Sequence, residues 1–310
     1  MWASEFINFK YDHSARIKDK INLSLTSYLI DPINAWDYTG TIREVTVCAP
    51  EQTGKTLSWV VGLLWSFIYT PCLSLVCYES DNKAAEINKD KLLPLMKAIP
   101  ELSAELAMPK SFRSDRYSFS NLTSYFQGAG SRISSKSSRV NVADEQDDWQ
   151  EHDNQVDNIQ DMRKRLRSFD ESLLYKVCTV KGSNPKDKKS SGVKASRIWG
   201  EFLNSSQGYW HLACQNADCQ SQKWQKYKGL TMRSCDVHNL QFNVDKENNL
   251  QENSCRLVCP VCGFEHEEKL KQQMNSQGGY IHKKPERLKG KFVHYGFQWG
   301  ALASPWETLG

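Results

Sequence analysis

The segment Ala49–Thr56 constrains the fold of this chain more than any other stretch. It reads Ala-Pro-Glu-Gln-Thr-Gly-Lys-Thr and lies between an apolar run at 45–48 and an apolar helical pattern at 55–69. A strand, a Gly-Lys-Thr loop and a helix in this order are typical of phosphate-binding loops. The pattern G-x-x-x-x-G-K-[ST] opens with glycine, whereas this chain has Ala49, which is less free to adopt positive φ. The sequence therefore predicts a nucleotide-binding loop with one departure from the pattern.

Each residue at the end of this loop has an expected role. The backbone N–H groups of Gln52, Thr53 and Gly54 would surround the phosphates, and the Lys55 ammonium would contact the β and γ oxygens. The Thr56 hydroxyl would help to hold Mg²⁺. A nucleoside triphosphate and Mg²⁺ are thus the predicted ligands, and Lys55 is a predicted catalytic residue.

A second motif is the short apolar run at 139–145, Arg-Val-Asn-Val-Ala-Asp-Glu, which ends in two adjacent acids. Neighbouring residues of a strand point to opposite faces, so the two acids can take different tasks at its end. Asp144 would bind Mg²⁺, and Glu145 would orient or deprotonate the attacking water. The alternative is a solvated acidic loop, because Asp147 and Asp148 follow directly.

Strand-like and helical patterns alternate from residue 43 to residue 182. This alternation predicts an α/β fold of the P-loop NTPase type, with a mainly parallel sheet flanked by helices and the nucleotide at the carboxyl edge of the strands. The expected strands are 45–48, 73–78, 117–126, 140–143 and 173–180, and the expected helices are 55–69, 82–97 and 157–168. The polar stretch at 181–192 is expected to be a mobile loop that serves as a linker or faces DNA.

The remainder of the chain divides by composition, and 310 residues favour two domains over one. We expect an N-terminal arm at 1–42, an ATPase core at 43–192, a Cys-rich subdomain at 193–282 and a C-terminal segment at 283–310. The uncharged run at 57–78 is as long as a membrane span, but Pro71 divides it into a helix and a buried strand. Because no secretory signal is visible either, we expect an intracellular protein with no membrane partner.

The net charge of +4 is too small to establish a nucleic-acid partner by itself. The basic residues nevertheless gather in clusters, which are candidates for contacts with a phosphate backbone, with solvated loop charge as the alternative. These clusters are Arg163, Lys164, Arg165 and Arg167, then Lys186, Lys188 and Lys189, and finally Lys283, Lys284, Arg287, Lys289 and Lys291.

Six of the ten cysteines lie between residues 214 and 262, whereas the others fall in apolar strand-like contexts. Cys259 and Cys262 form a Cys-Pro-x-Cys-Gly knuckle, and Cys214 and Cys219 form a looser C-x₄-C pair. Together these four thiolates would complete a tetrahedral Zn²⁺ site in a small zinc-ribbon-like subdomain, which the metal would help to fold. Rival ligands are Cys235, His238 and Cys255, and disulfides are a less favoured alternative in an intracellular protein.

Further motifs occur in a specific order along residues 30–310. They are Gln-Thr-Gly-Lys-Thr at 52–56, Asn-Lys-Asp-Lys-Leu-Leu-Pro at 88–94, Ile-Pro at 99–100, Gly-Ala-Gly-Ser at 128–131, Asp-Glu at 144–145, Ser-Arg-Ile at 196–198, the cysteine segment, and Tyr-Gly-Phe at 295–297 followed by Ser-Pro-Trp at 304–306. In this order they resemble the large terminase subunit of tailed bacteriophages, in the family typified by the lambda packaging protein.

The resemblance implies an ATP-hydrolysing motor that drives double-stranded DNA through the portal into a preformed capsid, in the cytoplasm of the bacterial host. It also implies a small terminase subunit as partner, a homo-oligomer as the active form, and a nuclease domain after the ATPase. Because the sequence stops just after residue 306, where that nuclease would begin, we expect it to be absent from this chain.

The resemblance also suggests roles for residues near the predicted site, with two departures. Thr179, in Cys178–Lys181, stands where relatives carry a Ser/Thr-rich segment that senses the γ-phosphate, so it is included among the catalytic residues. The first cysteine pair is C-x₄-C where relatives commonly have C-x-x-C. A charge-stabilising arginine is expected, for which Arg132 and Arg139 are candidates that could equally be surface charges.

Two other functions fit the same motifs. A helicase-like P-loop motor would share both nucleotide motifs but would separate DNA strands. A non-catalytic zinc-ribbon DNA-binding module with a degenerate loop is favoured only by Ala49, and the intact Lys55, Thr56, Asp144 and Glu145 oppose it.

Overall fold

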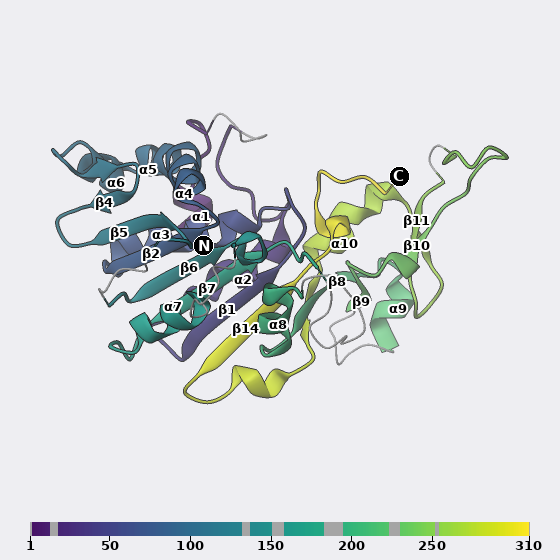
Figure 1. Cartoon of the computed structure of the whole chain (residues 1–310). Coiled ribbons are helices and arrows are strands. Elements are labelled where there is room, and N and C mark those ends of the chain that lie inside the picture. Colours follow the sequence, from purple (N-terminus) through teal and green to yellow (C-terminus); the bar gives the residue numbers. More distant parts are fainter. Residues whose placement is uncertain are drawn as a thin grey trace.

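The computed structural model describes residues 2–12, 18–131, 137–150, 158–182, 195–222, 230–251 and 254–309. One sheet of eleven strands dominates these residues, in the order β13-β8-β14-β1-β7-β6-β2-β5-β4-β3 with β9 paired to β8 (Figure 1). The bounds are β1 Ile42–Cys48, β2 Leu73–Tyr78, β3 Phe112–Arg113, β4 Arg116–Ser118, β5 Thr123–Gly128, β6 Val140–Asp144, β7 Leu173–Cys178, β8 Gly208–Ala213, β9 Leu230–Arg233, β13 Gly279–His282 and β14 Val293–Gln298.

The centre of the sheet is parallel, since β14, β1, β7, β6, β2 and β5 all run in the same direction. Their apolar, β-branched sequences suit strands that are covered on both faces. The carboxyl ends of β1, β6 and β7 therefore lie side by side at one edge of the sheet. This arrangement confirms the predicted α/β fold with a mainly parallel sheet.

Helices cover both faces of the sheet. On one face, α3 (Lys55–Tyr69) packs on β1 residues such as Val45 and Val47. On the other face, α7 (Asn158–Leu166) packs on Leu75 and Leu174, and α8 (Arg197–Leu203) packs on Cys48 and Cys178. The two faces are separated by the alternation of side chains along each strand. Within the described ranges, no helix has both the length and the apolar character needed to cross a bilayer.

The remaining elements are short. They are α1 Trp2–Phe6, α2 Ile30–Asn34, α4 Asp81–Ile87, α5 Leu93–Ala98, α6 Pro100–Leu106, α9 Ala217–Gln222 and α10 Lys271–Ser276, with β10 Leu240–Gln241, β11 Arg256–Val258 and β12 Glu265–His266 in a second, three-stranded sheet. In Figure 1 this small sheet and α9 lie at the end of the molecule beyond β8 and β9, far from β5.

Two predicted elements are wrong in detail. The expected strand 117–126 is in fact two antiparallel strands, β4 and β5. A turn at Ser120 and Asn121 separates them, and the N–H of Phe119 closes this turn by donating to the carbonyl of Leu122 at 3.1 Å. The expected helix 82–97 is interrupted by a π-helical turn at Asn88–Leu92. Pro94 follows this turn and lacks the N–H that would bond to the preceding turn of an α-helix.

The sheet crosses the expected domain boundaries near residues 192 and 282. Strands β8, β9 and β13 come from the Cys-rich range, yet they belong to the main sheet, and β14 from the C-terminal segment pairs with β1. Within the expected loop at 181–192, residues 183–192 lie outside the described part of the chain.

The N-terminal arm packs against the core around α3. The Trp36 indole N–H donates to the Ser66 hydroxyl at 2.7 Å, and the Tyr28 hydroxyl donates to the carbonyl of Thr53 at 3.0 Å. Gly62 of α3 makes room for this contact, because a Cβ there would lie 2.2 Å from the Trp36 ring. The arm is therefore part of the surroundings of the loop at 49–54.

A buried ion network lies between the sheet and the helices α7 and α8. The fully buried Lys176 ammonium lies 2.5 Å from both Glu44 and Glu201, and Arg163 donates to the same two carboxylates. Burial by itself raises the pKa of Glu44, but Lys176 and Arg163 outweigh burial and hold it well below its usual range. His294 is kept neutral because burial and Lys176 lower its pKa. Two acids and two bases thus balance in charge within the core.

We predict that Glu44→Gln lowers the free energy of unfolding by about 3 kcal/mol at pH 7, because the buried cations Lys176 and Arg163 then have only one carboxylate to balance their two charges. The folded-state pKa of Glu44 lies below the unfolded value of about 4.5, so this stabilisation is complete above that pH. The difference between the variant and the unmodified protein should therefore shrink as the pH falls below about 4.5. Urea unfolding at pH 7 and at pH 4 measures it.

The matched control is Glu86→Gln, which removes an exposed pair with Lys83 on α4 and should change stability by less than about 1 kcal/mol. Equal stability of the two variants at pH 7 would contradict the role given to the buried network.

Candidate nucleotide and metal sites

The loop between β1 and α3 turns at the carboxyl edge of the sheet. Gln52 and Gly54 adopt positive φ angles of 57° and 86°, and Gly54 is the residue that precedes the first turn of α3. Ala49 is not among the residues with positive φ. Alanine at position 49 is therefore compatible with the turn, and the one departure from the loop pattern carries no conformational cost.

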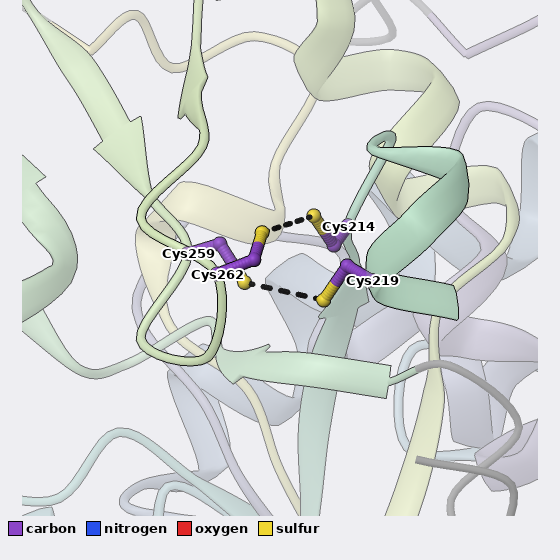
Figure 2. A group of neighbouring side chains, drawn as sticks. All are labelled: Cys214, Cys219, Cys259 and Cys262. Carbon is purple, nitrogen blue, oxygen red and sulfur yellow. Dashed lines mark hydrogen bonds between the residues drawn. The ribbon is translucent and has the colours of Figure 1, made fainter. Parts of the chain in front are cut away.

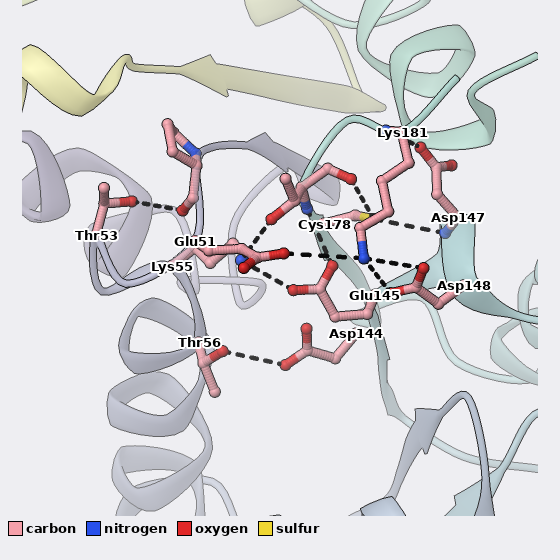
Figure 3. Close-up of polar contacts among 12 residues, drawn as sticks. Glu51, Thr53, Lys55, Thr56, Asp144, Glu145, Asp147, Asp148, Cys178 and Lys181 are labelled. Carbon is pink, nitrogen blue, oxygen red and sulfur yellow. Dashed lines mark hydrogen bonds and ion pairs between the residues drawn. The ribbon is translucent and has the colours of Figure 1, made fainter. Parts of the chain in front are cut away.

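Lys55 is buried and meets two residues from other strands at this edge. Its ammonium lies 2.9 Å from Glu145 Oε1 and donates to the Thr179 hydroxyl at 2.7 Å (Figure 3). The three residues follow the ends of β1, β6 and β7, respectively, so the parallel register brings them together. The structure thus unites the three residues predicted to be catalytic.

Glu145 is held in an unusual backbone conformation. It has φ 51° and ψ 46°, its N–H donates to the carbonyl of Val177 at 2.8 Å, and its Oε2 accepts from the N–H of Thr179 at 3.0 Å. A left-handed conformation is unfavourable for a residue with a Cβ and persists where neighbours fix it. These contacts aim the carboxylate at Lys55 rather than at bulk solvent.

Asp144 lies on the α3 side of the same strand end. Its Oδ2 accepts from the Trp59 indole N–H at 2.9 Å and from the Thr56 hydroxyl at 3.4 Å. Its Oδ1 is buried and has no hydrogen-bond partner within the described part of the chain. Burial and the neighbouring Glu145 raise the pKa of Asp144 to about 7. An oxygen donor pair with one unpartnered carboxylate oxygen fits a hard divalent cation such as Mg²⁺.

The two acids that follow have specific partners. The Asp147 carboxylate accepts from the Ser196 hydroxyl at 2.6 Å and from the N–H groups of Arg197 and Ile198 at 2.7 and 3.0 Å. Asp148 pairs with Lys181 at 2.7 Å. The alternative of a solvated acidic loop does not describe these residues, because Asp147 ties the strand end to the start of α8.

A cavity of about 620 Å³ adjoins the loop on the side of the N-terminal arm. Gln52, Lys55 and Thr56 line it together with apolar side chains of the arm and of two helices, among them Phe9, Leu25, Leu29, Val60 and Leu95. Sequence reasoning missed this cavity, since the arm shows no clear periodicity and its residues lie far from the loop in the chain. An apolar wall beside a phosphate-type loop can accommodate a planar, weakly polar group.

The four predicted zinc ligands form one cluster (Figure 2). Cys214 Sγ lies 3.8 Å from Cys262 Sγ, Cys219 Sγ lies 3.7 Å from Cys259 Sγ, and all four sulfur atoms lie within 4.8 Å of one another. Sulfur atoms placed about 2.3 Å from a tetrahedral zinc ion are about 3.8 Å apart, so the cluster fits this metal. The rivals Cys235, His238 and Cys255 are not part of the cluster.

Of the two candidate arginines, Arg139 lies at the wrong end of its strand. It precedes β6, pairs with Glu171 and stacks on the ring of Tyr38 at 5.5 Å, whereas Asp144 ends that strand. Arg139 is therefore held away from Lys55. Arg132 lies outside the described residues.

Comparisons with known proteins identify the family. A model described as phage terminase large subunit gpA, ATPase domain, matches residues 15–280. Among solved structures, the large terminase of bacteriophage HK97 is similar at 14% identity and a TM-score of 0.42, covering 57% of this chain and 36% of that one. A search of curated proteins finds no match. Because the family model spans most of the sequence, this chain belongs to the ATPase-domain family of the phage terminase large subunit gpA.

Proposed function

We propose that this chain is the ATPase motor portion of a viral terminase large subunit, which couples ATP hydrolysis to the translocation of double-stranded DNA into a procapsid. The proposal depends on one observation. Lys55, Glu145 and Thr179 contact one another at the carboxyl edge of the sheet, through an ion pair and two hydrogen bonds. Membership of a terminase ATPase family supports DNA as the substrate of the motor.

In this proposal ATP binding rearranges the three residues. The phosphates would be surrounded by the backbone N–H groups of Gln52, Thr53 and Gly54. The Lys55 ammonium would leave the Glu145 carboxylate and bind the β and γ oxygens instead. Release from Lys55 leaves the Glu145 carboxylate able to position a water for in-line attack. Thr179, whose N–H stays on Glu145, would sense the loss of the γ-phosphate.

Mg²⁺ would be held by Thr56 directly and by Asp144 through one of the waters of the cation, because Asp144 Oδ1 has no hydrogen-bond partner among the described residues. When bound, the cation neutralises charge that develops on the phosphate oxygens. The base of the nucleotide would occupy the cavity beside the loop, where Phe9 and Leu29 offer apolar surface next to the phosphate end.

A cationic surface on the outer part of the sheet is the proposed contact with DNA. Arg233 and Lys283 lie 4.7 and 4.6 Å from the centre of the Tyr209 ring, and both belong to the sheet region around β8. Arg287 and Lys291, which follow β13 in the chain, are also exposed. Contacts of this kind address phosphates without reading bases, as a motor that moves along any sequence requires.

Zn²⁺ is proposed to bind Cys214, Cys219, Cys259 and Cys262, which join α9 to the small sheet β10–β12. A bound zinc ion would hold these four sulfur atoms as thiolates, because zinc coordinates deprotonated cysteine. The small terminase subunit, the portal and further copies of this chain, in the host cytoplasm, complete the proposed assembly.

We predict Mg²⁺-dependent ATP hydrolysis that duplex DNA stimulates. Lys55→Ala and Glu145→Gln should each reduce the turnover number by about 100-fold or more, because one loses phosphate binding and the other the alignment of water. Phosphate release measured with and without linear duplex DNA tests both. The control is Lys83→Ala, which removes an exposed lysine on α4 and should leave turnover unchanged.

The same assay separates the alternatives. Arg233→Ala combined with Lys283→Ala should lower the stimulation by duplex and its salt dependence while leaving basal hydrolysis intact. Strand displacement would favour a helicase-like motor, and nucleotide binding without turnover under any condition would favour the non-catalytic module. Undiminished hydrolysis by Lys55→Ala would refute the proposed site.

We predict about one zinc ion per chain, lost on Cys259→Ser, because a structural zinc site needs all four ligands. Metal analysis by mass spectrometry measures it, together with the melting temperature, which should fall when the metal is removed by a chelator. The matched control is Cys255→Ser, a buried cysteine outside the cluster, which should retain zinc. A folded protein that contains no metal would rule the site out.

A further inference from the structure

Tyr78 is a buried phenol whose hydroxyl group has no hydrogen-bond partner among the residues that the structure describes. It ends β2 and is only 2% exposed. Its ring packs edge to face on Trp59 of α3, with 6.2 Å between the ring centroids. Buried polar atoms are nearly always hydrogen-bonded in proteins, so a free hydroxyl at a strand end indicates a missing partner.

A second buried oxygen without a hydrogen-bond partner among the described residues, Asp144 Oδ1, belongs to the last residue of the neighbouring strand. The parallel pairing of β2 with β6 aligns Cys77 with Ala143, so the next residues, Tyr78 and Asp144, end neighbouring strands on the same face. Trp59 touches both, through its ring and through its indole N–H, respectively. Burial, with the nearby charges of Asp144 and Glu145, holds the pKa of Tyr78 well above its usual range, so the phenol remains a hydrogen-bond donor.

The two atoms are chemically complementary. Tyr78 can donate and Asp144 Oδ1 can accept, but no hydrogen bond joins them directly. A water molecule placed between them would satisfy both atoms, since it can form a hydrogen bond with the phenol oxygen and donate to the carboxylate. Mg²⁺ in nucleotide sites keeps several of its waters, and Thr56 and Asp144 mark where the cation would lie.

We propose that the Tyr78 hydroxyl holds a water of the Mg²⁺ hydration shell jointly with Asp144, which makes Tyr78 a positioning residue for the metal. The inference rests on the proposed ATPase function and adds to it a residue that lies outside the loop at 49–56, at the end of β2.

Tyr117 provides a matched comparison within the same protein. Its hydroxyl is also buried and unpartnered, but its ring lies among Phe67, Phe112, Phe119 and Phe126, with centroids 5.2 to 6.2 Å away. Tyr117→Phe therefore removes the same atom from an apolar, aromatic environment. A purely structural effect of deleting a buried hydroxyl should be alike in both variants.

The experiment titrates MgCl₂ at a fixed concentration of fluorescently labelled ADP and follows binding for the unmodified chain, Tyr78→Phe and Tyr117→Phe. Tyr78→Phe should raise the Mg²⁺ concentration for half-maximal binding about threefold to tenfold, the effect of one lost hydrogen bond. Tyr117→Phe should leave it unchanged. Without ligands, both variants should melt no lower than the unmodified protein, because neither hydroxyl has a protein partner.

The outcomes separate the two claims. If the unmodified chain binds Mg²⁺ and ADP but Tyr78→Phe has the same Mg²⁺ dependence, this inference is overturned and the ATPase proposal stands. If the unmodified chain binds no nucleotide at any Mg²⁺ concentration, both are overturned. A lower melting temperature of ligand-free Tyr78→Phe, with Tyr117→Phe unaffected, would show a structural partner for the hydroxyl and also overturn the inference.

Discussion

The contact between Lys55 and Glu145 depends on the parallel register of the sheet. Lys55 starts α3 directly after the loop that follows β1, Glu145 follows β6, and Thr179 follows β7, which lies between those strands. Parallel strands present their carboxyl ends at one edge, so three segments far apart in the chain supply one site. In the proposed mechanism, a bound nucleotide would displace Glu145 from its ion pair with Lys55.

Charged groups extend from this edge along the face of α7 and α8. Asp147, two residues after Glu145, holds the first turn of α8 through Ser196 and two backbone N–H groups. The same helix carries Glu201, which meets Lys176 inside the core. Phe202 of α8 then packs on Tyr209, the residue under the cationic surface. The proposed nucleotide edge and the proposed DNA contact are thus connected through α8, which is held at its first turn by Asp147 and near its end by the ion pair of Glu201 with Lys176.

Short local motifs predicted which residues lie close together at the candidate sites. Lys55, Asp144, Glu145 and the two cysteine pairs each stand in a short, recognisable pattern, and the structure brings them together as expected. The sheet order around β8, β13 and β14 could not be predicted, because these strands return to β1 after more than a hundred residues. The cavity at Phe9 was missed for the same reason, since its walls are assembled only by tertiary packing.

Other differences have local physical causes that the patterns conceal. The turn at Ser120 divides a run of strand-forming residues, and a π-helical turn followed by Pro94 interrupts an otherwise regular helical pattern. Tyr78 gives no signal in the sequence, because an aromatic residue at the end of a buried strand is ordinarily a core residue. Only its unpartnered hydroxyl beside Asp144 distinguishes it.

The affinity for Mg²⁺ and ATP, measured by titration calorimetry on the unmodified chain, Lys55→Ala and Glu145→Gln, tests the central claim most directly. The account predicts that Lys55→Ala weakens binding about tenfold or more, through the loss of a charge-assisted contact with phosphate. Glu145→Gln should bind at least as tightly as the unmodified chain, because Lys55 no longer has to leave a carboxylate. Equal affinity of Lys55→Ala and the unmodified chain would contradict the account.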